Sequence, residues 1–188
     1  MEIGINPYDV IPYLSEPFAL SRPSHLSVLS QIFGNTPPAP DRASVLELGC
    51  GSGNNIIPLA FLNPESSYLG IDSSQTQIIL GQELITELGL KNITLICNTI
   101  ETFNDPDIFD YIICHGMYSW VKEPTQERIL EIFKRSLTKN GLAYISYNTF
   151  PGWHHRSIVR NAMLFHTRNI EDPKKKILEG RAYLNFLA

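Results

Sequence analysis

The feature that most constrains the fold is a regular alternation of short apolar runs with helix-like segments between residues 44 and 147. The runs SVLEL, SYLGID, NITLIC, FDYIIC and LAYISY have the length and composition of buried strands. Strands that alternate with helices pair in parallel, because each helix carries the chain back to the same end of the sheet by a right-handed crossover. The pattern therefore predicts an α/β fold with a doubly wound, mainly parallel sheet.

Helix boundaries fill the gaps between these strands. One helix is expected over residues 54–62, and Ser73 or Ser74 predicts the cap of a second that stops at Gly89. A third is expected to begin at Pro124 and to end at Gly141. The apolar residues expected to face inward are Ile78, Ile79, Ile85 and Leu88 in the second helix and Ile129, Leu130, Phe133 and Leu137 in the third.

The chain is expected to comprise three parts. Residues 1–43 hold a proline-rich extended arm and a helix from Pro23, whose apolar stripe is Leu26, Leu29, Ile32 and Phe33. Residues 44–150 form the α/β domain. Residues 151–188 read as two helices, 155–167 and 173–188, with Asp172 as a cap. Apolar residues continue to the last position, which favours a chain that leads into further domains, without the last strands of the full fold, over a helix folded back on the sheet.

Composition excludes several classes of protein. The net charge of −4 and the absence of a basic field argue against a nucleic-acid partner. No apolar window of transmembrane length exists, so no membrane association is expected. Cysteines 50, 97 and 114 are too dispersed for a disulfide framework or a zinc site, which indicates the cytoplasm, and the last two are expected to be buried. The adjacent pair His154-His155 lacks a third ligand, so we expect no metal.

A glycine-rich loop, VLELGCGSGNN, follows the first strand. Gly49, Gly51 and Gly53 allow a sharp turn and a close approach of a ligand to the backbone. Because Asn54 stands where a dinucleotide fingerprint needs glycine, and no Gly-Lys-Ser/Thr follows, neither a dinucleotide fold nor a phosphate-binding loop is indicated.

Two carboxylates narrow the choice of ligand. Asp72 ends the second strand beside the loop, where an acidic residue can accept hydrogen bonds from both ribose hydroxyls, although it could instead cap the next helix. Glu47 ends a buried strand, which is costly without a partner. It would repel a pyrophosphate and attract a positive charge. The loop therefore suits a cationic or zwitterionic nucleoside.

The stretches VLELGCGSGNN, YLGIDSS and FDYIICHGMYSWV together resemble the successive motifs of class I S-adenosylmethionine-dependent methyltransferases. The resemblance implies a Rossmann-like methyltransferase fold with S-adenosyl-L-methionine as cofactor. It implies contacts to the methionine part, the ribose and the adenine from Glu47, Gly49, Cys50, Gly51, Asn54, Asp72, Ser73, Thr99, Ile100 and His115. The sequence departs from the family at Thr99, where many members have an acidic residue.

A closer resemblance covers residues 7–188. PYDVIPYLSEPFALSRPSHL, SQTQIILGQ, HGMYSWV and SYNTFPGWHHRSIVRNAM are similar to bacterial methyltransferases that carry a methyltransferase regulatory domain. Some members of that group are protein-lysine methyltransferases, and members are usually longer than this chain.

The acceptor site is expected at the carboxyl ends of the fourth and fifth strands, where ligands bind in open α/β sheets. Aromatic faces there can stabilise a sulfonium or an amine. We expect the catalytic residues among His115, Tyr118 and Tyr147, with His115 as base for a hydroxyl or small-molecule substrate. The expected substrate pocket consists of Tyr13, Trp120, Asn148 and Trp153. Tyr118 and Trp120 could equally be core residues under a loop.

The leading functional hypothesis is methyl transfer to a protein side chain, with lysine among the candidates. Its rivals are a small-molecule methyltransferase and a cofactor-binding fragment that is inactive without C-terminal domains. A nicotinamide oxidoreductase is disfavoured by Glu47 and Asn54. The sequence leaves the oligomeric state open.

Overall fold

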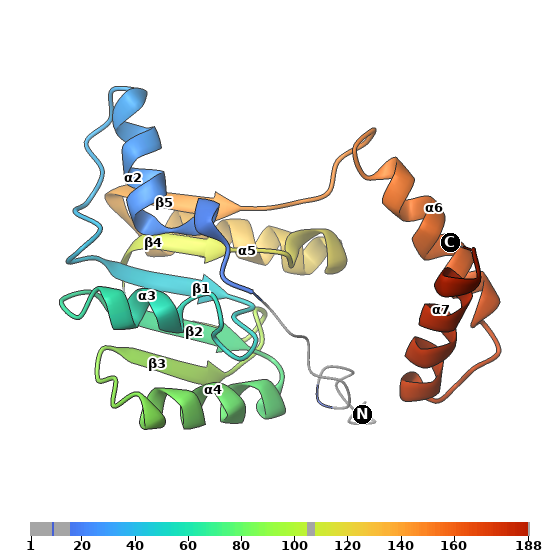
Figure 1. Cartoon of the computed structure of the whole chain (residues 1–188). Helices are drawn as coiled ribbons and strands as arrows, with labels where there is room; N and C mark the ends of the chain where they lie inside the picture. Colours follow the sequence, from blue (N-terminus) through green and yellow to red (C-terminus); the bar gives the residue numbers. More distant parts are fainter. Residues whose placement is uncertain (1–8, 10–15, 105–107, 188) are drawn as a thin grey trace. The chain divides into compact units, whose positions relative to one another are not determined.

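The computed structural model describes residues 9, 16–104 and 108–187 (Figure 1). The chain divides into two compact units. The larger lies within residues 12–147 and contains the sheet, and the smaller contains residues 148–187. Tyr13 lies outside the described residues.

The sheet of the larger unit has five parallel strands: β1 (Ser44–Leu48), β2 (Ser67–Asp72), β3 (Ile93–Cys97), β4 (Phe109–Cys114) and β5 (Leu137–Ile145). They run in the order β3-β2-β1-β4-β5, with β1 paired to β2 and β4 (Figure 1). This confirms the predicted doubly wound, Rossmann-like sheet. The chain moves outward in opposite directions from β1, so the ends of β1 and β4 mark the point where ligands bind in such sheets.

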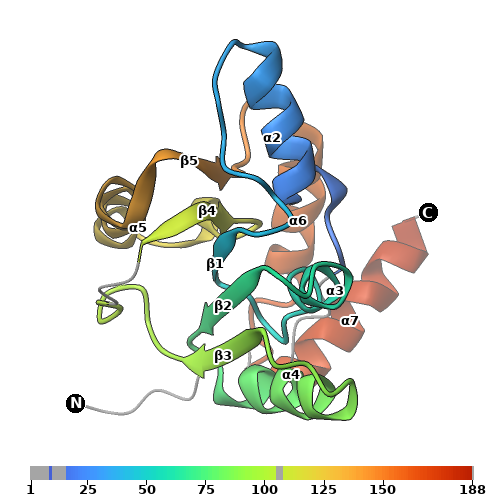
Figure 2. The same ribbon diagram turned by 90° about the vertical axis from the view of Figure 1, so that its left-hand side faces the viewer.

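Helices cover both faces of the sheet (Figure 2). The helices α2 (Pro23–Ile32), α3 (Ile57–Leu62) and α4 (Gln75–Glu87) lie on one face, and α5 (Glu123–Ser136) lies on the other. Two hydrophobic clusters match this division: Val45, Ile57 and Ile78 belong to one, and Leu46 and Ile129 belong to the other. Alternate residues of β1 thus supply both cores, as the strand period of two requires.

Two helix boundaries differ from expectation, and the structure decides between the two predicted caps of α4. Helix α3 begins at Ile57 instead of Asn54, because left-handed glycines hold residues 51–56 in turns. Ser74, and not Ser73, caps α4, since its side chain accepts a hydrogen bond from the Gln77 N–H. Gly141 does not end α5: strand β5 begins immediately after that helix, at Leu137, and Gly141 lies inside it.

The expected apolar faces were only partly correct. In α2, Leu29, Ile32 and Phe33 are 41%, 71% and 80% exposed, and the buried residues of this helix are Pro23, Ser27 and Ser30. Helix α2 lies beside the edge strand β5 and the 3-10 turn η1 (Ala19–Ser21). Other expected inward residues that are exposed are Ile79, Leu88 and Leu130. Cys97 is exposed as well, while Cys114 is buried.

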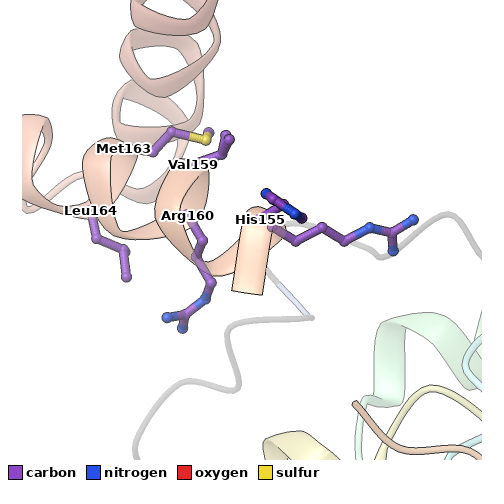
Figure 3. A pocket seen from close by; sticks show the side chains of 6 residues that line it. His155, Val159, Arg160, Met163 and Leu164 are labelled. Carbon is purple, nitrogen blue, oxygen red and sulfur yellow. The ribbon is translucent and has the colours of Figure 1, made fainter. Parts of the chain in front are cut away.

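The smaller unit contains the helices α6 (His154–His166) and α7 (Pro173–Leu187), as predicted. The rings of His166 and Tyr183 stack at 4.3 Å between them, and Asp172 caps α7 by accepting a hydrogen bond from the Lys175 N–H. A cavity of about 490 Å³ on α6 is lined by His155, Arg156, Val159, Arg160, Met163 and Leu164 (Figure 3). None of the helices in the described part of the chain is long and apolar enough to span a membrane.

Candidate functional site

The glycine loop after β1 is fixed by its own backbone. Gly49, Gly51 and Gly53 have φ angles of 71°, 57° and 78°, which only glycine adopts without strain. The N–H groups of Gly49 and Cys50 both donate to the Ile71 carbonyl at 2.9 Å, so the loop is tied to the end of β2. The loop therefore has a defined backbone conformation.

Glu47 lies beneath this loop and is only 3% exposed. Its Oε1 accepts a hydrogen bond of 2.7 Å from Nδ2 of Asn55. Its Oε2 is buried and has no hydrogen-bond partner among the described residues. Burial raises the pKa of Glu47 from 4.5 to about 8, opposed by the Asn55 hydrogen bond and reinforced by the nearby negative charge of Asp72. A buried acceptor without a donor is costly, so the carboxylate favours a ligand that brings one.

Asn55, which the sequence argument missed, is the loop asparagine that holds Glu47. It is buried, whereas Asn54 is half-buried and lines a cavity of about 550 Å³ with α3 and α4 side chains that include Ile57 and Leu84. Two adjacent amides are equivalent in sequence, and the turn decides which of them points at the carboxylate.

Asp72 is held by two backbone donors. Its Oδ2 accepts a hydrogen bond from the Gly51 N–H, and its Oδ1 accepts one from the Ser74 N–H, both at 2.9 Å. Asp72 therefore fixes the loop and assists the start of α4 at the same time. Since a carboxylate oxygen has two lone pairs, each oxygen keeps one acceptor position. That arrangement can still receive two ribose hydroxyls.

The end of β3 lies beside Asp72. The Asn98 N–H donates to the Asp72 carbonyl at 2.9 Å, and the exposed Thr99 hydroxyl lies 2.9 Å from that of Thr102. Ile100 is only 5% exposed and belongs to the core cluster on the α5 face. Its side chain is therefore occupied by packing, which leaves only its backbone for a ligand. Ser73 is exposed at the corner before α4.

Aromatic side chains gather after β4 and β5. The Nδ1 of His115 lies 3.1 Å from the Ser146 hydroxyl, which also accepts the Gly116 N–H at 2.7 Å. Burial lowers the pKa of His115, so the neutral imidazole is favoured at pH 7. The rings of Tyr118 and Tyr147 are tilted by 60° to each other, with centroids 6.3 Å apart.

Trp120, on the 3-10 turn η2 (Tyr118–Trp120), is 50% exposed, so it is not a core residue. Tyr118 does pack partly against the core cluster on the α5 face, and Tyr147 is 61% exposed.

The loop after β4 lies directly against the glycine loop. A Cβ built on Gly49 would come within 2.7 Å of the Met117 sulfur. The loop that carries His115 and Tyr118 is therefore adjacent to the glycine loop. Met117 and Ser146 were not predicted, because a methionine or a serine after a strand carries no distinctive pattern.

Phe18 is a further residue that sequence reasoning missed. Its ring stacks on His115 at a centroid distance of 4.1 Å, and its N–H donates to Oδ1 of Asn55 at 2.8 Å. The described end of the arm, from Glu16 to Arg22, thus contacts both sides of the site and includes the turn η1.

Asn148 and Trp153 belong to the smaller unit. Trp153 precedes α6, and its ring lies 5.8 Å below the Arg156 guanidinium carbon. Their part in a substrate pocket stays a prediction. Within the residues that the structure describes, no three His, Cys, Asp or Glu side chains are grouped so as to hold a metal ion.

The residues of the larger unit fit a zwitterionic nucleoside. The loop offers a fixed glycine backbone, Asp72 offers two acceptor positions, and Glu47 offers a buried oxygen that lacks a donor among the described residues. Among the residues that the structure describes, burial, Asn55 and Asp72 determine the pKa of Glu47 and no positively charged side chain contributes, so a ligand can bring the missing charge.

Comparison with known proteins also indicates a methyltransferase domain. A family model described as a methyltransferase domain matches residues 40–180. The uncharacterized protein RP789 of Rickettsia prowazekii (strain Madrid E) is 42% identical over 183 residues, which are 97% of this chain and 33% of that protein. RP028 of the same organism is 38% identical over 96% of this chain and 72% of that protein.

Among solved structures, PKMT2 from Rickettsia typhi in complex with AdoHcy superposes with a TM-score of 0.83 at 38% identity. The superposition covers 94% of this chain and 34% of that chain. The chain thus spans about a third of RP789 and of PKMT2.

Proposed function

On the premise that this chain belongs to the methyltransferase domain family, with S-adenosylmethionine as its cofactor, we propose that it directs a methyl group to a protein side chain, with lysine as the favoured acceptor. The likeness to PKMT2, solved with AdoHcy, supports this choice. So does the sequence resemblance to a group with protein-lysine methyltransferases among its members.

The proposed cofactor contacts follow from the donors that the site lacks. The free acceptor positions of Asp72 receive the ribose hydroxyls, and Oε2 of Glu47 receives the ammonium of the methionine part. The backbone of residues 98–100 borders the adenine, and the loop from Gly49 to Gly53 supports the methionine part. When bound, the cofactor supplies an electrophilic methyl group on a cationic sulfur.

The observation that carries the acceptor proposal is the set of aromatic side chains that follow β4 and β5. The rings of Tyr118 and Tyr147 lie 6.3 Å apart, and Nδ1 of His115 lies 3.1 Å from the Ser146 hydroxyl. The loop that carries His115 and Tyr118 meets the glycine loop at Met117. A lysine must lose a proton before it can attack, which costs about 5 kcal/mol at pH 7. A pocket lined by aromatic rings lowers that cost, because desolvation disfavours the charged amine. Tyrosine faces also attract the cation as it enters.

His115 suits this role because burial keeps its pKa low and its ring neutral. A neutral imidazole does not repel a cationic amine, and its free nitrogen can take up the proton that the amine releases. The Ser146 hydroxyl, 3.1 Å from Nδ1, orients the ring.

The test is to incubate the protein with S-adenosylmethionine labelled in the methyl group and a bacterial extract, then to separate proteins from small molecules. We expect label on protein, with methyl-lysine found by mass spectrometry after digestion. The Asp72→Ala variant is the control, since it should bind the cofactor too weakly to label anything. Label confined to small molecules would replace the proposal with the small-molecule alternative. Cofactor binding without any label, even from a longer chain, would leave only a binding module.

A further inference from the structure

A continuous series of contacts joins the two sides of the site through the end of the N-terminal arm. Nδ2 of Asn55 donates to Glu47 at 2.7 Å, and Oδ1 of the same amide accepts the Phe18 N–H at 2.8 Å. The Phe18 ring then stacks on His115, with centroids 4.1 Å apart and planes inclined by 13°. Neither the cofactor contacts nor the acceptor chemistry proposed above uses Phe18.

The backbone at Phe18 is fixed from two directions. Besides the Asn55 bond, the Phe18 carbonyl accepts the Ser21 N–H at 3.1 Å and the Ser21 hydroxyl at 2.9 Å. Ser21 has no exposed surface, and its hydroxyl also accepts a hydrogen bond of 3.2 Å from Nδ2 of Asn55. Buried hydrogen bonds therefore anchor the segment to the loop. Moving Phe18 would leave these buried polar groups without partners, which is costly, so the position of Phe18 is fixed.

The ring of Phe18 in turn restricts His115. One face of the imidazole is covered by Phe18, the Tyr144 ring lies 6.1 Å away, and Nδ1 is held by Ser146. Because Phe18 covers one face of the imidazole and Ser146 holds one edge, the His115 ring is restricted to a single orientation. Tyr144 is the titratable ring beside His115, and burial is the cause of the lowered pKa of the imidazole.

We propose that Phe18 is a positioning residue that holds the His115 imidazole toward the acceptor and connects it, through Asn55, to Glu47 on the cofactor side. This inference rests on the proposed function for the part that His115 has in methyl transfer. The contrasting interpretation is that Phe18 only fills space, in which case any apolar side chain of similar size would serve.

The test is an NMR titration of His115 in the protein without cofactor, with the resonance assigned by its loss in His115→Gln. Phe18→Leu keeps an apolar side chain but removes the stacked ring, and Phe18→Tyr keeps the ring. We expect the pKa of His115 to rise toward its ordinary value in Phe18→Leu and to be unchanged in Phe18→Tyr. Leu20→Ala is the matched control, because Leu20 is 50% exposed in the same turn. A His115 pKa in Phe18→Leu equal to that of wild type would overturn the proposal. If Phe18→Leu does not fold, Phe18→Met gives the same comparison.

The connection to the cofactor side has its own test by calorimetry with AdoHcy. Phe18→Leu keeps the backbone N–H, so we expect its Kd to stay within twofold of wild type. Asn55→Ala removes the hydrogen bonds to Glu47 and to the Phe18 N–H, so we expect at least a fivefold weaker Kd together with a changed pKa of His115. A weaker Kd with an unshifted titration in Asn55→Ala would overturn the connection.

A third readout separates this inference from the proposed function. In an active protein, Phe18→Leu should lower kcat at least threefold and leave the KM for the cofactor within twofold; an unchanged kcat would count against positioning. The titration requires neither cofactor nor acceptor. If the protein binds no AdoHcy, the proposed function fails while the titration still decides whether Phe18 positions His115.

Discussion

The two sides of the candidate site hold their side chains by different means. On the side of β1 and β2, backbone N–H groups and a buried amide fix Glu47 and Asp72 at distances of 2.7–2.9 Å. On the side of β4 and β5, rings contact one another at centroid distances of about 4–6 Å, and Trp120 and Tyr147 are largely exposed. Backbone hydrogen bonds are strongly directional, whereas ring contacts allow several stacked and edge-to-face arrangements.

This difference matches two tasks. A cofactor that is the same in every turnover is best met by a rigid set of polar atoms, whose geometry the backbone determines. The acceptor side chain proposed above must enter and leave, which suits a surface of exposed rings with few hydrogen bonds. The comparison predicts that substitutions on the first side change cofactor affinity, whereas those on the second side change methyl transfer.

The largest effect is expected for Asp72→Ala. Its carboxylate is proposed to receive two hydroxyls in charge-assisted hydrogen bonds, each worth about 1.5–3 kcal/mol. We expect the Kd for AdoHcy, measured by calorimetry, to weaken at least tenfold. Because Asp72 also accepts the N–H groups of Gly51 and Ser74, thermal unfolding without ligand should show a parallel loss of stability. An unchanged Kd would remove Asp72 from the ribose site.

The next effect concerns the rigidity of the loop. Gly49→Ala places a Cβ at a φ of +71° and within 2.7 Å of the Met117 sulfur, so we expect it to reduce the free energy of unfolding by about 1–3 kcal/mol. Gly34→Ala is matched in backbone strain, at a φ of +82°, but meets nothing within 4 Å. The difference between the two in urea denaturation isolates the contact between the loops. Equal losses would mean that Met117 moves aside without cost.

Glu47→Gln should change the pH dependence of both stability and binding. The pKa of Glu47 is raised by folding from 4.5 to about 8, so the folded state binds the extra proton between these values. Its contribution to stability is therefore present in full below pH 4.5 and is lost as pH rises to 8. The glutamine variant cannot ionise at this position, so it should not lose this stability. In thermal unfolding, Glu47→Gln should therefore become more stable relative to wild type as pH rises from 4.5 to 8.

Cofactor binding should respond to the same group in the opposite direction. A bound ammonium favours the ionised carboxylate, so wild-type affinity should increase several-fold from pH 6 to 8, and that of Glu47→Gln should not. Glu65→Gln, at an exposed ion pair with Arg42, is the control that should show neither trend. Identical pH profiles in Glu47→Gln and wild type would place the ammonium elsewhere.

The smallest effect on cofactor binding is expected on the aromatic side. Trp120→Leu removes a ring that is 50% exposed and lies on the turn η2, after β4. The Kd for AdoHcy should stay within twofold of wild type, while methyl transfer to protein falls. A tenfold loss of cofactor affinity would contradict the division of the site into two sides.

The pattern of the sequence was sufficient for the strands. A buried central strand such as β1 or β4 must be apolar on both faces, so SVLEL and FDYIIC could be recognised locally. The helix faces were less predictable, because periodicity shows that a stripe exists but not whether a partner covers it. In α2 the stripe of Leu29, Ile32 and Phe33 is exposed, and the serines of the opposite side are buried.

The sequence by itself determined the sheet, the glycine loop and the presence of two carboxylates beside it, because strand alternation, positive φ and the cost of a buried charge are local properties of the chain. Only the tertiary structure decided which asparagine holds Glu47, that Ile100 is committed to the core, and that Met117 lies over Gly49. It also placed Phe18 on His115, across 97 positions of the chain. Contacts of this kind join segments that are distant in sequence, and no local pattern encodes which of several similar side chains will meet.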